Sequence, residues 1–60
     1  MVLTWKITIN LSGENHVYYR KASAEDALYY ARRQMVKDCG ISLARVRSLH
    51  YEIEATKEKS

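Results

Sequence analysis

SAEDALYYARRQMVKDCG, residues 23–40, is the stretch that decides the fold, because it alone is long enough and correctly bounded to form a helix. Ser23 is a favoured N-cap residue, and Gly40 can adopt the left-handed conformation that ends helices. We therefore expect a helix over this stretch, with one apolar stripe facing a sheet. The stripe, in which residues recur every three or four positions, consists of Ala24, Ala27, Leu28, Ala31, Met35 and Cys39.

Two segments on either side of this helix alternate between apolar and polar side chains, as strands buried on one face do. Residues 2–11 form the longer of them and predict the first strand. Its apolar positions are Leu3, Trp5, Ile7, Ile9 and Leu11. Leu49, Tyr51 and Ile53 resume the alternation after the helix and predict the third strand. Residues 41–45 fit neither period, and we expect them to form a connector.

The second strand is expected over residues 16–22. Its most apolar alternating pair is Val17 and Tyr19, so we expect these two side chains to face the helix. The even-numbered residues, Tyr18 among them, then face away. A three-residue loop at residues 13–15 satisfies that pairing if its last residue is left-handed.

Together these segments predict an α+β fold, a three-stranded antiparallel sheet with one helix packed on one face. The element order is ββαβ. If the third strand returns beside the first, the order across the sheet is 2-1-3 and the second strand lies at an outer edge. We expect one domain over residues 1–55 and a flexible tail over residues 56–60.

Length and composition restrict the possible functions. A chain of 60 residues buries only about 60% of its unfolded surface, so a partner subunit would add needed core. The single cysteine, Cys39, excludes an internal disulfide, and no apolar run is long enough to cross a membrane. We expect a cytoplasmic protein with no membrane partner. The net charge is +3, with the basic excess concentrated in residues 20–47.

No group of residues predicts catalysis, a metal site or a cofactor. His16 and His50 belong to strands that the first strand separates, which is too far apart for one metal ion. Cys39 lies at the carboxyl end of the helix, where the dipole does not activate a thiol. Glu52 and Glu54 are expected to pair with a lysine of the first strand. We expect a protein that is not an enzyme.

The sequence favours binding of a protein partner. Tyr18, Tyr29 and Arg20 are residue types enriched at the energetic centres of protein interfaces, and we predict that all three are exposed. Residues 16–22 contain no proline that would block pairing at the sheet edge. We therefore expect a small regulatory or binding module that forms a homodimer through this edge.

The alternative is an accessory protein that binds DNA or RNA. Five basic residues near the end of the helix and in the following connector can hold phosphates if they lie together. They are Arg32, Arg33, Lys37, Arg45 and Arg47. The same residues are also compatible with a solvated helix surface that serves only solubility.

Overall fold

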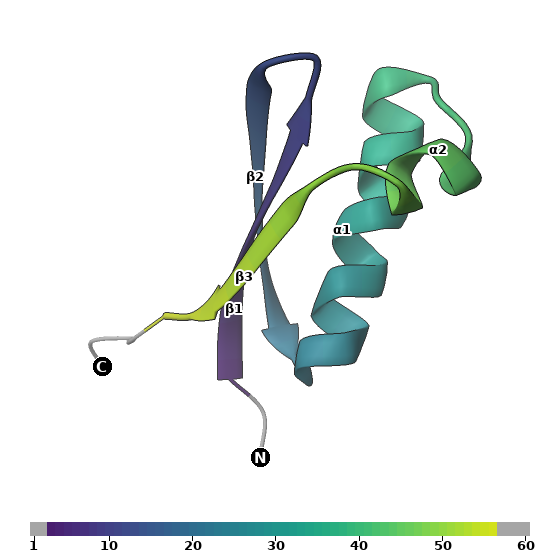
Figure 1. Cartoon of the computed structure of the whole chain (residues 1–60). Coiled ribbons are helices and arrows are strands. Elements are labelled where there is room, and N and C mark those ends of the chain that lie inside the picture. Colours follow the sequence, from purple (N-terminus) through teal and green to yellow (C-terminus); the bar gives the residue numbers. More distant parts are fainter. Residues whose placement is uncertain (1–2, 57–60) are drawn as a thin grey trace.

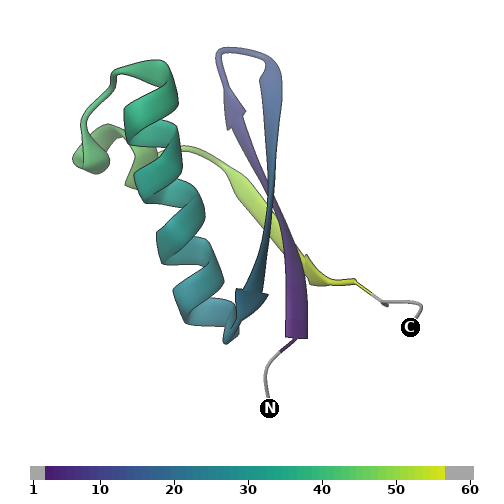
Figure 2. The same cartoon turned by 180° about the vertical axis from the view of Figure 1, so that it is seen from behind.

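A computed structural model describes residues 3–56 of the chain, and its elements are β1 (Leu3–Leu11), β2 (Glu14–Ala22), α1 (Ala24–Cys39), α2 (Leu43–Arg47) and β3 (Tyr51–Ala55). The three strands form one sheet in the order β2-β1-β3, and both neighbouring pairs are antiparallel. The predicted α+β architecture is therefore confirmed. Figures 1 and 2 show α1 standing along the β1–β2 hairpin, with the hairpin turn near the carboxyl end of α1.

The ends of α1 are fixed by the two residues that the sequence singles out. The Oγ atom of Ser23 accepts a hydrogen bond from the backbone N–H of Asp26 at 3.3 Å. Gly40 has a φ of +67° and donates its N–H to the carbonyl of Val36 at 3.0 Å. These bonds satisfy backbone groups that a helix leaves unpaired at its termini, so the expected boundaries are confirmed.

The core lies between α1 and the central strand. Its buried side chains are Ile7, Ile9, Ala27, Ala31, Met35 and Val46. The two alanines let the helix approach the sheet closely, and Leu28 and Cys39 pack at the margin of this cluster as the predicted stripe requires. Burying such apolar side chains supplies most of the stabilisation of a small domain.

The orientation of β2 differs from the expectation, because its turn has two residues instead of three. Ser12 and Gly13 form the turn with φ values of 53° and 87°, the signs required by the type I′ turn that best fits a twisted hairpin. Leu11 consequently pairs with Glu14, and Ile7 pairs with Tyr18. Since side chains alternate along a strand, this change of one residue turns every β2 side chain to the other face.

Two predicted inward residues therefore lie on the face of the sheet that α1 does not cover, which we call the open face. Val17 is 44% exposed and Tyr19 is 59% exposed, and they pair with Thr8 and Lys6 of β1. Tyr18, predicted to face away, is instead half-buried and packs against the core cluster. The prediction for these three side chains was wrong.

A short second helix, α2, overlaps the segment that was expected to be a connector, residues 41–45. Ser42 caps α2 by accepting a hydrogen bond from the N–H of Arg45 at 3.2 Å, just as Ser23 caps α1. Val46 of α2 is 1% exposed and enters the core beside α1. Leu43 and Val46, which are three residues apart, thus lie on one helical turn.

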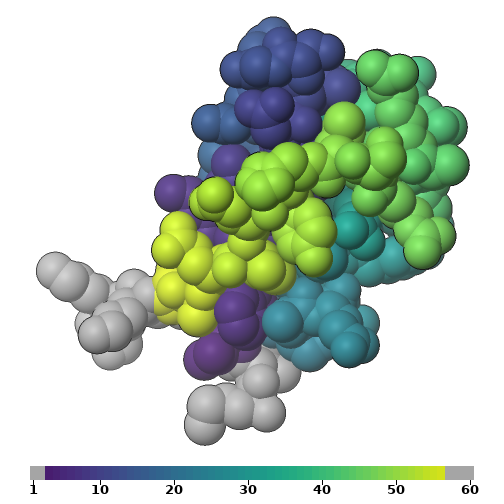
Figure 3. Space-filling view, in the orientation of Figure 1, coloured from purple at the N-terminus to yellow at the C-terminus, as the bar shows by residue number. Residues whose placement is uncertain are grey.

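β3 completes the sheet on the other side of β1, and Figure 3 shows it running across the molecule from α2. Its Glu54 pairs with Lys6, and Oε1 of Glu54 lies 4.0 Å from Nζ of Lys6, as expected for a pair across neighbouring strands. Thr56, assigned to the tail from sequence, donates its N–H to the Thr4 carbonyl at 2.9 Å. The rest of the predicted tail, residues 57–60, lies outside the described residues.

The faces of the sheet can be distinguished by two alanine substitutions. Ile7→Ala removes a fully buried side chain and should lower the free energy of unfolding by about 2–5 kcal/mol. Val17→Ala shortens an exposed side chain on the open face and should cost less than about 1 kcal/mol. Urea denaturation followed by circular dichroism measures both, and equal losses would contradict the observed orientation of β2.

Candidate interaction surface

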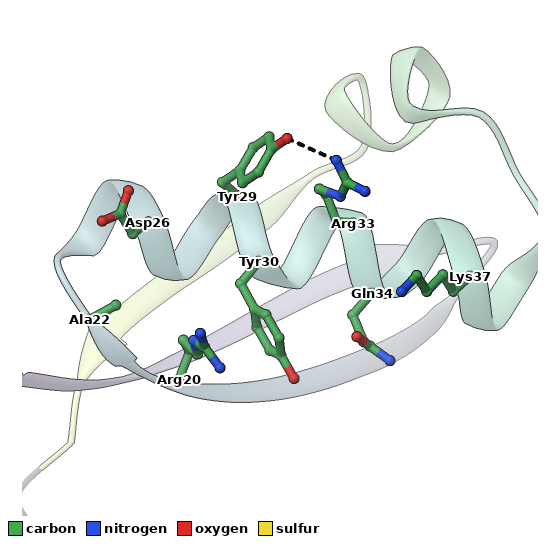
Figure 4. Close-up of a pocket in the computed structure, with 8 residues that line it drawn as sticks. All are labelled: Arg20, Ala22, Asp26, Tyr29, Tyr30, Arg33, Gln34 and Lys37. Carbon is green, nitrogen blue, oxygen red and sulfur yellow. Dashed lines mark hydrogen bonds between the residues drawn. The ribbon is translucent and has the colours of Figure 1, made fainter.

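A shallow groove of about 430 Å³ runs between α1 and β2, and we call it the basic groove. Its lining residues are Arg20, Ala22, Asp26, Tyr29, Tyr30, Arg33, Gln34 and Lys37. Figure 4 shows α1 running along β2 here, with Tyr30 and Gln34 extending from the helix toward the strand. The groove thus combines one helix surface with the outer strand of the sheet.

Stacking on tyrosine rings positions two of its guanidinium groups. Cζ of Arg20 lies 4.5 Å from the centre of the Tyr30 ring, which links β2 to α1. Cζ of Arg33 lies 5.7 Å from the Tyr29 ring, and its Nη1 donates a hydrogen bond to Oη of Tyr29 at 3.1 Å. That bond raises the pKa of Arg33 above its ordinary value. Each guanidinium keeps further N–H donors for a ligand, because arginine carries five.

The groove is positively charged. Arg20, Arg33 and Lys37 contribute three positive charges and Asp26 contributes one negative charge, so the lining carries a net charge of +2. Among residues 3–56, the ion pairs within 4.0 Å are Lys6 with Glu54 and His50 with Glu52. None of the three groove cations is therefore paired with a carboxylate of the described chain. Anionic side chains or phosphates suit such a surface.

The backbone of β2 presents unpaired groups beside this groove. Asn10 donates its N–H to the carbonyl of His50, and the Thr4 carbonyl accepts from Thr56, so the even-numbered residues of β1 bond to β3. The odd-numbered residues of β1 bond to β2, because an antiparallel strand directs successive residues to alternate sides. Their partners in β2 are even-numbered, as in the pair of Ile7 with Tyr18.

The odd-numbered residues of β2 therefore point their backbone N–H and C=O groups away from β1. We call this row, formed by Asn15, Val17, Tyr19 and Lys21, the β2 edge. Because β2 is the outermost strand, no other strand of the sheet covers it. The same residues direct their side chains to the open face, so the edge combines available hydrogen bonds with two exposed apolar groups.

The structure separates the three residues predicted to bind a protein. Arg20 and Tyr29 both line the basic groove. Tyr18 lies elsewhere and is half-buried, and burial, followed by electrostatic interactions with Asp38 and Cys39, raises its pKa. Its predicted exposure was wrong, because the two-residue turn at Ser12 and Gly13 pairs Tyr18 with Ile7 and so places it on the helix side of the sheet. Their role in binding stays a prediction.

The five basic residues of the nucleic-acid alternative are distributed over different surfaces. Arg33 and Lys37 line the basic groove. Arg32 lies on the β3 side of α1, with its Cζ 5.1 Å from the Tyr51 ring. Arg45 lines a separate hollow beside Leu11 and His16, at the turn end of the hairpin, and Arg47 is exposed on α2. One site holding all five is not formed within the described chain.

The two histidines also lie on different faces. His16 pairs with Ile9 and lines the hollow that includes Cys39 and Arg45 on the helix side. His50 lines a small polar depression with Thr8 and Asn10 on the open face. Between residues 3 and 56, no three His, Cys, Asp or Glu side chains are grouped so that they could hold a metal ion.

Gln34 is a groove residue that the sequence reasoning missed, and the contact of Tyr30 with Arg20 was not predicted. Tyr30 lies at the border of the apolar stripe, where periodicity does not decide its direction. The available signal was the dipeptide Ser12-Gly13, because a two-residue turn places Arg20 on the helix side, within reach of Tyr30.

Comparisons of the chain with protein-family models, with curated proteins and with solved structures found no match. Within residues 3–56, neither helix has the length and apolar character needed to cross a membrane. Any account of function must therefore start from the basic groove and the β2 edge.

The position of Tyr18 predicts a dependence of stability on pH. Burial raises its pKa, and electrostatic interactions with Asp38 and Cys39 add to the shift. The folded protein thus holds the phenol proton more tightly than the unfolded chain, whose tyrosine pKa is about 10. This contribution is complete below about pH 10 and is lost as the pH rises further, because the unfolded state then binds fewer protons.

Urea denaturation between about pH 9 and about pH 11 measures this effect. The free energy of unfolding of the wild type should fall more steeply with pH than that of Tyr18→Phe, which has no phenol to ionise at this position. Tyr19→Phe is the matched control, because Tyr19 is 59% exposed. Equal slopes for the wild type and Tyr18→Phe would contradict the burial of this hydroxyl.

Proposed function

We propose that this protein is a non-enzymatic protein-binding module that accepts an extended strand at the β2 edge. The observation that carries the proposal is the row of outward backbone groups at Val17, Tyr19 and Lys21 on the outermost strand. A peptide that pairs there gains main-chain hydrogen bonds, and its side chains contact both faces of the sheet.

Two properties make this edge better suited to strand addition than the edge at β3. β2 has nine residues and β3 has five, so β2 offers the longer ladder. Val17 and Tyr19 add exposed β-branched and aromatic surface next to the outward backbone groups, and such side chains form favourable pairs across strands.

A second copy of the chain can also donate its β2 strand, which would give the homodimer expected from sequence. Antiparallel pairing of two β2 strands centred on Tyr18 would set Val17 of one copy opposite Tyr19 of the other. The two sheets would then join into one of six strands. This pairing is supported by the small size of the core, to which a partner adds apolar contacts.

The nucleic-acid alternative has less support. Stacking of bases on aromatic rings is a main source of affinity for single strands. Here guanidinium groups already lie over the rings of Tyr29, Tyr30 and Tyr51. The basic residues proposed for phosphate contacts are also spread over several surfaces, as described above.

A proline at position 19 tests the role of the β2 edge. Tyr19→Pro removes an outward N–H that β1 does not use, so the fold should be retained while strand addition is lost. Proline at position 18 would instead remove an N–H that bonds to Ile7 and would disrupt the hairpin. Tyr19→Ala, which keeps the N–H and removes the ring, separates the backbone effect from the side-chain effect.

Sedimentation velocity at increasing protein concentration measures self-association of the three proteins. We expect the wild type to form weak dimers that dissociate on dilution, because the two basic grooves repel one another. Tyr19→Ala should form still weaker dimers, and Tyr19→Pro should be a monomer with an unchanged circular dichroism spectrum. A folded Tyr19→Pro protein that still dimerises as the wild type does would exclude the β2 edge as the contact.

A further inference from the structure

We propose that the strand donor for the β2 edge is an acidic extended segment of another protein, with carboxylates at alternate positions and apolar side chains between them. The inference rests on the proposed strand addition and adds the chemistry of the partner. It depends on the position of the basic groove directly beside the edge that accepts the strand.

A strand paired with β2 directs alternate side chains to opposite faces. On the helix side they lie beside the basic groove, whose cations Arg20, Arg33 and Lys37 have no carboxylate partner among residues 3–56. On the open face they lie beside Val17 and Tyr19, both of which are exposed. The complementary segment is therefore acidic on one face and apolar on the other.

The groove cations lie on both elements that flank the edge. Arg20 belongs to β2, and its side chain is on the helix side of the sheet beside Tyr30. Arg33 and Lys37 belong to α1, which runs along β2, and Figure 4 shows Arg33 beside Tyr29 on the side of the helix away from the strand. Carboxylates on one face of an added strand therefore lie beside Arg20, and Arg33 and Lys37 add to the positive charge around them.

Charge also distinguishes this donor from a second copy of the chain. Pairing two β2 strands places both α1 helices on the same face of the joined sheet, so two basic grooves, each with a net charge of +2, approach one another. Like charges at close range oppose association, whereas a carboxylate-bearing strand neutralises the groove. A polypeptide also uses the free amides and carbonyls of the β2 edge, which a nucleic acid backbone cannot pair with in register.

The test uses the full-length protein and a fluorescein-labelled eight-residue peptide of alternating valine and glutamate. Fluorescence anisotropy should show saturable binding that weakens as salt is added, because the contact is between charges. A peptide of the same composition with its glutamates in one block should bind at least about tenfold more weakly, since it cannot present carboxylates on one face. Equal binding of the two peptides would overturn the proposal.

Two pairs of charge reversals, each changing the net charge by four units, test the groove itself. Arg33→Glu with Lys37→Glu should weaken binding of the acidic peptide at least about tenfold and create binding of an alternating valine and lysine peptide. Arg45→Glu with Arg47→Glu, on α2, should change affinity less than about threefold. Arg33→Gln with Lys37→Gln removes the cations without adding acid near the carboxyl end of α1 and guards against unfolding. Equal losses from both pairs would overturn the proposal.

Tyr19→Pro separates failure of this inference from failure of the proposed function. Loss of acidic-peptide binding in this variant supports both. Unchanged peptide binding in a folded Tyr19→Pro protein would support a groove that binds anions and would exclude strand addition. If the wild type does not bind the peptide yet forms dimers that Tyr19→Pro abolishes, strand addition is supported and the acidic partner is excluded.

A single-stranded oligonucleotide of equal charge tests the nucleic-acid alternative. Binding that is tighter than that of the peptide, and that is lost on reversal of Arg33 and Lys37, would assign the groove to nucleic acid.

Discussion

The two-residue turn at Ser12 and Gly13 determines which side chains of the hairpin reach α1, and most of the surface follows from it. A three-residue turn formed by the same sequence would exchange the faces of β2, placing Val17 against the helix and Arg20 on the open face. Ser12 adopts a positive φ without being glycine, which costs about 1 kcal/mol. The register is therefore maintained by more than the turn: Ile7 and Ile9 must stay against α1, and β2 is paired to them.

The parts of the fold that could be predicted from sequence are those specified by local chemistry. Ser23 and Gly40 bound α1 because capping depends on only a few neighbouring residues. β1 alternates so regularly that its buried face is unambiguous. β2 is different, since Val17, Tyr18 and Tyr19 are three consecutive apolar residues and no alternation selects a face. α2 was missed because five residues are too few for a periodic stripe, although its cap at Ser42 resembles that of α1.

The candidate site was only partly predictable for a related reason. Arg32 and Arg33 are adjacent in sequence but about 100° apart around the helix, so one stacks on Tyr51 of β3 and the other lies beside Tyr29 in the basic groove. Grouping them by sequence proximity joined residues that the helix separates. The contact of Arg20 with Tyr30 depends in addition on the register of the hairpin, which no single element specifies. Contacts between elements can be predicted only when the topology, the turn length and the rotation of the helix are all known.

The positive charges near the β2 edge affect which strands can pair there in two ways. Outer strands with exposed backbone groups pair readily with one another, and natural proteins often oppose such pairing by placing cations along the edge. Arg20 and Lys21 occupy that position here, and Arg33 and Lys37 extend the positive field onto the neighbouring helix. The same field that disfavours a like-charged strand favours an acidic one, so selection against the wrong partner and attraction of the right one need no separate residues. In the proposed strand addition the backbone groups would contribute affinity without regard to sequence, so specificity would come from the basic groove and from the exposed Val17 and Tyr19.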